Sequence, residues 1–302
     1  MNKLLYIPAF LLLLASFSCE DVVDINANFD KSELVVDAWL NQLDTTQTVF
    51  LSLTQDYFQA SASPAVTDAT VTLLNDTKGT QIPFTHKGNG AYEWTPQPGE
   101  TIGEVGDEFT LSVSYQDWNY QAGSQLNPVP PIDSIVYEVR EEELGSPAGI
   151  YAQFYARDLP GEGNTYWIKT YKNGMFLNKP SEMNLSADGT FDLGSGTDAI
   201  VFIPPIRETI NRIADADDTE DDDTVPPYAI GDQIRVEIHA ITIPAFRFLG
   251  IAREQMTNGS NGIFALPVAN SPSNVIGLEA DAPKALGFFN MAMVSALEVV
   301  VE

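Results

Sequence analysis

The sequence predicts a mostly β protein in two domains with one short helix, and three observations carry this prediction. Apolar and polar residues alternate with period two along many short segments, and these segments are separated by turn residues. A stretch with three prolines in four residues, at 128–131, interrupts this alternation and is typical of an extended spacer. One segment, at 245–256, instead repeats apolar residues at helical spacing.

Residues 1–18 have the layout of a bacterial lipoprotein signal peptide. A short basic start precedes an apolar run at 4–15, which is too short to span a bilayer, and a small-x-small exit at 16–18. Cys19, the only cysteine of the chain, follows as the natural acceptor of a diacylglyceryl anchor. An ordinary secretory signal cut at the same bond is the alternative.

An acidic, extended tether is predicted over residues 19–32. Glu20, Asp21 and Asp24 follow the cysteine closely. This arrangement resembles the signal by which Bacteroidota-type lipoproteins are displayed on the outer face of the outer membrane. A merely solvated tether in an acidic protein is the alternative.

Residues 33–127 are predicted to form an immunoglobulin-like or transthyretin-like β-sandwich. Six or more strands fit within about 95 residues, which favours a sandwich. The order "DATVTLLND", "GNGAYEW", "GDEFTLSVSY" resembles such modules. The strands are expected at 34–39, 49–54, 69–74, 82–85, 91–94 and 109–115.

A proline-rich linker at 128–132 separates this domain from a β-rich C-terminal domain at 133–302. The amphipathic helix of this domain is expected to carry on one face the apolar residues Ala245, Phe248, Leu249, Ala252 and Met256, and Asn258-Gly259 offers a stop. The strands are expected at 134–138, 152–159, 166–172, 199–203, 233–243, 286–289 and 294–301.

Charge excludes some classes of partner. The chain has 42 Asp plus Glu against 15 Lys plus Arg, a formal net charge of −27. Such a surface repels nucleic-acid phosphates and anionic headgroups, so we expect no nucleic-acid partner and membrane attachment through the lipid alone. Cationic partners and divalent ions remain open.

Several segments together resemble the DUF4249 lipoproteins of Bacteroidota. They are "SCEDVVDIN", "ELVVDAWL", "PVPPIDSI", "YAIGDQIRVEIHAIT" with "FRFL", and "SPSNVIGLEADAPKALGFFNM". The resemblance implies an accessory outer-membrane lipoprotein, encoded beside a TonB-dependent receptor, with a role in binding or uptake. It implies no catalytic residues.

Catalytic patterns are weak. His239 shares a strand face with Arg235 and Glu237 and is expected on the solvent face beside such a neighbour, while His86 precedes a turn and is expected in a loop. No Gly-x-Ser-x-Gly or His-Glu-x-x-His motif occurs. We therefore expect a protein that is not an enzyme, with a surface hydrolase as the least favoured alternative.

Two further parts of the sequence are candidate binding sites. Asp215, Asp217 and Asp221 imitate the start of a calcium loop, but the glycine turn and the bidentate glutamate are missing, so a mobile acidic loop is predicted and Ca²⁺ is the alternative. Trp118, between Asp117 and Asn119 at an expected hairpin tip, is expected to be exposed and is the candidate contact for a ligand or partner, while Trp94 is expected in a core strand.

The predicted function is thus an accessory lipoprotein, anchored to the outer membrane, that binds a ligand or a TonB-dependent receptor without catalysis. A stand-alone protein that captures a glycan or peptide at the surface is the alternative.

Overall fold

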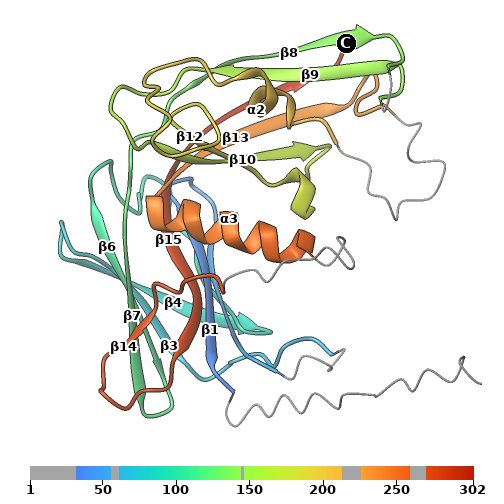
Figure 1. Cartoon of the computed structure of the whole chain (residues 1–302). Helices are drawn as coiled ribbons and strands as arrows, with labels where there is room; N and C mark the ends of the chain where they lie inside the picture. The colour runs from blue at the N-terminus through green and yellow to red at the C-terminus, as the bar shows by residue number, and fades with distance from the viewer. Residues whose placement is uncertain (1–31, 56–60, 144–145, 213–225, 259–269) are drawn as a thin grey trace, which may run out of the picture.

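The computed structural model describes residues 32–55, 61–143, 146–212, 226–258 and 270–302. The described part is mostly strand, so the predicted fold class is confirmed. Figure 1 shows two halves, one above the other, with helix α3 between them. No helix of the described part is long and apolar enough to cross a membrane.

The lower half contains most of the first 125 residues. Its strands are β1 Leu34–Asn41, β2 Gln47–Leu53, β3 Thr70–Asn75, β4 Thr80–Gly88, β5 Ala91–Trp94, β6 Glu108–Tyr115, β7 Trp118–Gln125 and the short β14 Ile276–Gly277.

The upper half contains the middle of the chain. Its elements are β8 Ile132–Arg140, β9 Gly149–Ala156, β10 Thr165–Lys172, β11 Met175–Leu177, the 3-10 turn η1 Pro180–Glu182, β12 Asn184–Ala187, α2 Pro204–Glu208, β13 Gln233–Ile241 and α3 Ile243–Asn258.

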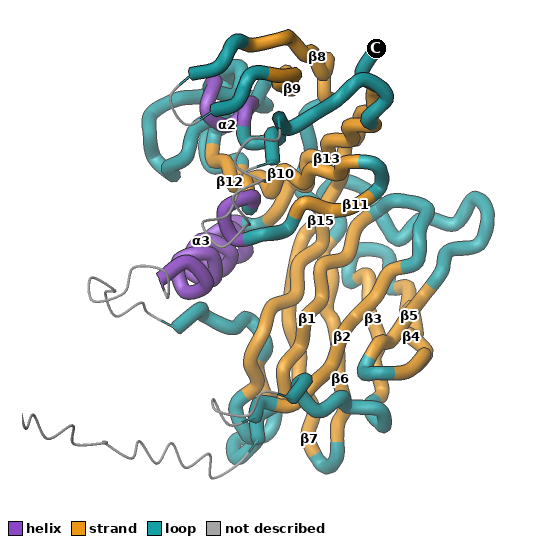
Figure 2. The backbone as a smooth tube through the Cα atoms, turned by 90° about the vertical axis from the view of Figure 1, so that its right-hand side faces the viewer, coloured by secondary structure: helices purple, strands orange, loops and turns teal. Residues whose placement is uncertain are grey.

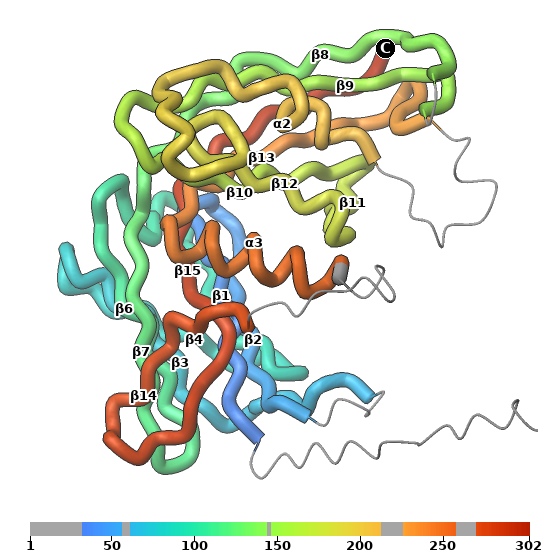
Figure 3. The backbone as a smooth tube through the Cα atoms, in the orientation of Figure 1, coloured from blue at the N-terminus to red at the C-terminus, as the bar shows by residue number. Residues whose placement is uncertain are grey.

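One long strand, β15 Ala285–Val300, belongs to both halves. Its first half pairs in parallel with β1, from Leu34 opposite Ala285 to Asn41 opposite Ala292. Its second half pairs antiparallel with β13, so a continuous sheet runs from β11 in the upper half to β14 in the lower half. Figures 1 and 3 show β15 passing behind α3 from one half to the other.

The lower sheet encloses one hydrophobic core. Alternate residues of β1 point into it, and Phe289 and Met291 of β15 lie there too. Strand β7 lies back against β15, where the Met291 backbone N–H donates to the Ser124 hydroxyl at 2.8 Å. The immunoglobulin-like or transthyretin-like type, the boundary at 128–132 and the division into 33–127 and 133–302 stay predictions.

In the upper half, β10 and β13 have an apolar layer on each face. The hairpin of β8 and β9 covers one face together with α2, and α3 packs on the other (Figures 1 and 2). The predicted helix is confirmed as α3, with Ala245 and Leu249 buried, and it ends at Asn258 as expected. Met256 was expected on the buried face, but it is 52% exposed.

One predicted strand, at 199–203, is wrong. Only Val201 forms a single bridge, to Arg157, and helix α2 follows at Pro204. Proline at the first helical positions lacks only an N–H that the helix would leave unpaired, so Pro204 and Pro205 favour the start of a helix.

Candidate functional site

Several residues singled out in the sequence lie outside the described residues. They are Cys19, Asp215, Asp217 and Asp221, whose predicted roles therefore stay predictions. Within the described part, no three His, Cys, Asp or Glu side chains gather as metal ligands. Trp118 lies beside the β6–β7 hairpin tip, as expected, but it is half-buried and not exposed, because it packs against the lower core. Its contact with a partner stays a prediction.

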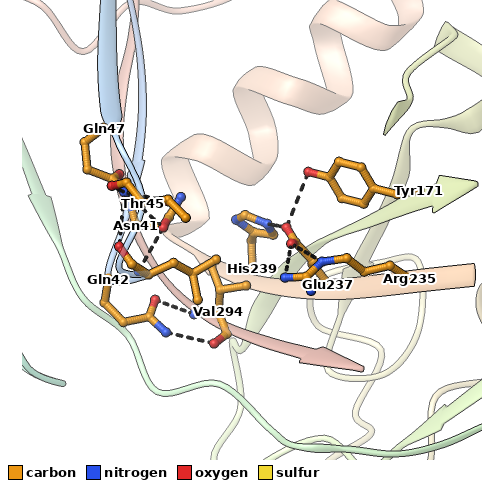
Figure 4. Close-up of polar contacts among 10 residues, drawn as sticks. Asn41, Gln42, Thr45, Gln47, Tyr171, Arg235, Glu237, His239 and Val294 are labelled. Carbon is orange, nitrogen blue, oxygen red and sulfur yellow. Dashed lines mark hydrogen bonds and ion pairs between the residues drawn. The ribbon is translucent and has the colours of Figure 1, made fainter. Parts of the chain in front are cut away.

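His239 is paired with a neighbour, as predicted, but it is not on a solvent face. The residue is only 5% exposed, because α3 packs on the face of β13 that carries it. Its Nε2 lies 2.9 Å from Glu237, which also accepts from Arg235 at 2.9 Å and 2.8 Å. Figure 4 shows these residues together with Tyr171, whose hydroxyl donates to Glu237 at 3.4 Å. The other histidine, His86, lies in β4 and not in a loop.

The charges in this network are fixed by its burial and pairing. Burial and the Lys169 charge lower the pKa of His239 to about 4, against the opposing effect of Glu237. Burial alone would raise the pKa of Glu237, but His239 and Arg235 bring it well below its usual value. At neutral pH the network therefore holds a neutral imidazole that donates from Nε2, an ionised carboxylate and a guanidinium. Such a network orders β13 and β10.

A second polar cluster holds the end of β1 in place (Figure 4). Strand β1 ends at Asn41, so among the described strands none pairs with the edge of β15 beyond Ala292 on that side. The Gln42 side chain pairs this edge: it accepts from the Val294 N–H at 2.7 Å and donates to the Val294 carbonyl at 2.8 Å. Gln47 accepts from the Asn41 N–H at 2.8 Å.

These two networks flank a cluster of rings that we call the aromatic corner: Trp39, Trp167, Phe176, Phe248 and Phe288. The rings come from β1, β10, β11, α3 and β15, so both halves contribute. Trp39 makes an edge contact with Trp167 at 5.4 Å between ring centroids and stacks on Phe288 at 5.8 Å. Trp39, Trp167 and Phe176 remain half-buried.

Lys169 lies against this corner. Its ammonium is 4.0 Å from the centre of the Trp167 ring and 5.7 Å from that of Phe176. Within the described part it forms no hydrogen bond or ion pair, and its side chain is half-buried. Burial lowers its pKa to about 8, although the Glu237 and Asp37 charges act in the opposite direction. The ammonium thus has donors that no described residue occupies.

Asp37, on β1, is the matching acceptor. Burial raises its pKa, and the Trp39 side chain and the Lys169 charge oppose this. Its side chain is nevertheless exposed, and within the described ranges it forms no ion pair. A group that is reachable from water but surrounded by enough protein to lose part of its hydration is suited to bind a ligand.

The sequence did not single out this corner. Period two places Lys169 on the face of Trp167, and Asp37 on the face of Trp39, but no pattern shows that these two faces meet. They meet because β15 connects β1 to β13, and β13 pairs with β10.

Fold and corner together define a mostly β protein with two halves built around one shared strand and an aromatic, charged corner where they meet. The chain belongs to the DUF4249 family, described as a domain of unknown function, which matches residues 20–297. The resemblance found in the sequence is therefore confirmed at the level of the family. No curated protein matches the chain.

Proposed function

We propose that this protein is a non-catalytic binding lipoprotein of the Bacteroidota outer membrane. It is anchored through Cys19 and serves a TonB-dependent receptor in uptake, by binding the receptor or a ligand delivered to it. The observation that carries the proposal is the aromatic corner, where Lys169 and Asp37 lie beside half-buried rings without an ion-pair partner in the described ranges. Ligand sites combine apolar walls with a few such polar groups.

The main alternative is a protein that captures a glycan or peptide alone, and the same corner supports it. A surface hydrolase has less support. His239, the histidine of the polar network, is buried and its Nε2 donates to Glu237, and within the described ranges it makes no hydrogen bond to a Ser or Thr hydroxyl.

Replacing Cys19 by alanine is expected to abolish lipid attachment. Metabolic labelling with a fatty-acid analogue should label the wild type and a Ser18→Ala control, which keeps the thiol, but not Cys19→Ala. The Cys19→Ala protein should leave the membrane fraction while keeping its β-type circular dichroism spectrum. Equal labelling of wild type and Cys19→Ala would exclude a lipid anchor at this residue.

The receptor partner is tested separately. Affinity purification of the tagged full chain from membranes in mild detergent is expected to recover a TonB-dependent receptor in near-equal amount. A mock purification from the untagged strain is the control. Recovery of the tagged chain alone, with ligand binding intact, would support stand-alone capture and exclude a stable receptor complex.

A further inference from the structure

We propose that the aromatic corner, with Lys169 and Asp37, binds a neutral oligosaccharide. The inference rests on the proposed binding function and names its ligand. It depends on three features: half-exposed rings, an ammonium without a hydrogen-bond partner among the described residues, and an exposed carboxylate without an ion pair there.

The rings provide the apolar part of such a site. Trp167 and Lys169 point to the same side of β10, and the adjacent β11 adds Phe176. On the lower side, Phe50 of β2 lies directly across from Asp37 and is 50% exposed. Phe50 on one side of the charged groups, and the half-exposed Trp167 and Phe176 on the other, offer apolar surface for the C–H faces of sugar rings.

The polar groups supply the complementary hydrogen bonds. The Lys169 ammonium has three donors, and an ionised carboxylate such as that of Asp37 accepts only. A sugar hydroxyl donates and accepts, so neighbouring hydroxyls can satisfy both groups at once. Because Lys169 has already lost part of its hydration, a hydrogen bond to it is gained at little further desolvation cost.

Charge favours a neutral ligand over an ionic one. The opposite charges of Lys169 and Asp37 cancel, and the charge of the nearby Glu237 is already neutralised by Arg235. An anionic ligand would approach a protein of net charge −27 and place its charge beside Asp37, whereas a cation would lie beside Lys169. A polyol avoids both repulsions.

The test is calorimetric titration of the purified full chain, in mild detergent, with five neutral hexasaccharides: cello-, malto-, laminari-, xylo- and mannohexaose. Hexagalacturonate serves as the anionic comparison. We expect at least one neutral hexasaccharide to bind and to change the tryptophan fluorescence, and hexagalacturonate to bind more weakly.

Two substitutions connect binding to the corner. Lys169→Met keeps the aliphatic stem but removes the donors, and Asp37→Ala removes the acceptor. Each is expected to weaken binding about tenfold, the usual effect of losing a hydrogen bond to a charged group. Lys87→Met, at an exposed position on β4, is the matched control and should bind like the wild type.

Failure of all five neutral sugars to bind, tighter binding of hexagalacturonate, or unchanged affinity in Lys169→Met would overturn the inference. Its failure is distinguishable from that of the proposed function. Recovery of a receptor without sugar binding would leave the receptor role standing, and sugar binding without a receptor would leave the inference standing.

Discussion

Alanine at position 287 is expected to destabilise the whole chain by at least about 3 kcal/mol. Gly287 lies in β15, with φ of +91°, where it pairs with Val36 of β1. An added Cβ would lie 1.9 Å from the Val36 carbonyl oxygen, so β1 and β15 would have to separate. Since β15 contributes to both halves, the loss should appear as one cooperative decrease in the free energy of unfolding.

Gly231→Ala is the matched control. Gly231 has φ of +92°, almost the same backbone conformation, but its added Cβ would meet nothing within 4 Å. It should therefore show only the conformational cost of a positive φ, about 1–2 kcal/mol. Urea denaturation of the two variants measures the difference. Equal destabilisation would contradict a close contact between β15 and β1.

Acidification is expected to destabilise the protein through His239. Its folded-state pKa of about 4 lies below the unfolded value of about 6.5, so between these pH values the unfolded chain binds a proton that the folded chain does not. The contribution of the neutral His239 to the free energy of unfolding is therefore fully present above about pH 6.5. It falls as the pH drops toward 4, by up to about 3 kcal/mol. Glu237, whose pKa is lowered, adds its own loss only below about pH 4.5.

Urea denaturation at several pH values between 6.5 and 4.5 measures this slope. We expect it in the wild type and in His86→Gln, which removes the other histidine of the chain, but not in His239→Gln. In the wild type, the His239 imidazole resonance should not titrate above about pH 5. A resonance that titrates near 6.5 would show that the ring is hydrated and free of the surrounding charges of Glu237, Arg235 and Lys169.

The strands and α3 were largely predictable because period two and period 3.6 are properties of local sequence. Whether each strand face is buried or exposed to solvent could not be predicted in the same way. The pattern placed His239 on the face of Glu237 and so predicted their pairing, but whether water or another element covers that face depends on α3, which returns over β13. Predicting that His239 is buried would therefore have required the position of α3, which the sequence of one strand does not contain.

The shared strand was not predictable for a specific reason. Residues 286–289 and 294–301 were expected as two strands, and Asn290 lies in the segment between them. In the structure Asn290 is 1% exposed and its side-chain oxygen accepts from the Thr242 N–H and hydroxyl, each at 3.1 Å. A buried polar residue with partners from a distant turn looks like a strand end when only the local sequence is known.

The aromatic corner could not be predicted for the same reason. Trp39 and Trp167 are about 130 residues apart and meet only through the β1–β15–β13–β10 order. The sequence favoured Trp118 because its polar neighbours suggested exposure, but no local pattern identifies rings that long-range strand pairing gathers and leaves half-buried.

The order of the strands along the chain has a consequence for how the protein matures. Strand β15 follows every other described strand, yet it pairs with β1, the first of them. It completes the sheet of the lower half through β1 and that of the upper half through β13. A polypeptide that emerges with its N-terminal residues first therefore cannot complete either half until nearly the whole of it is present. Long-range closure of this kind slows folding, so neither half of a newly made chain can fold completely before the last strand is present.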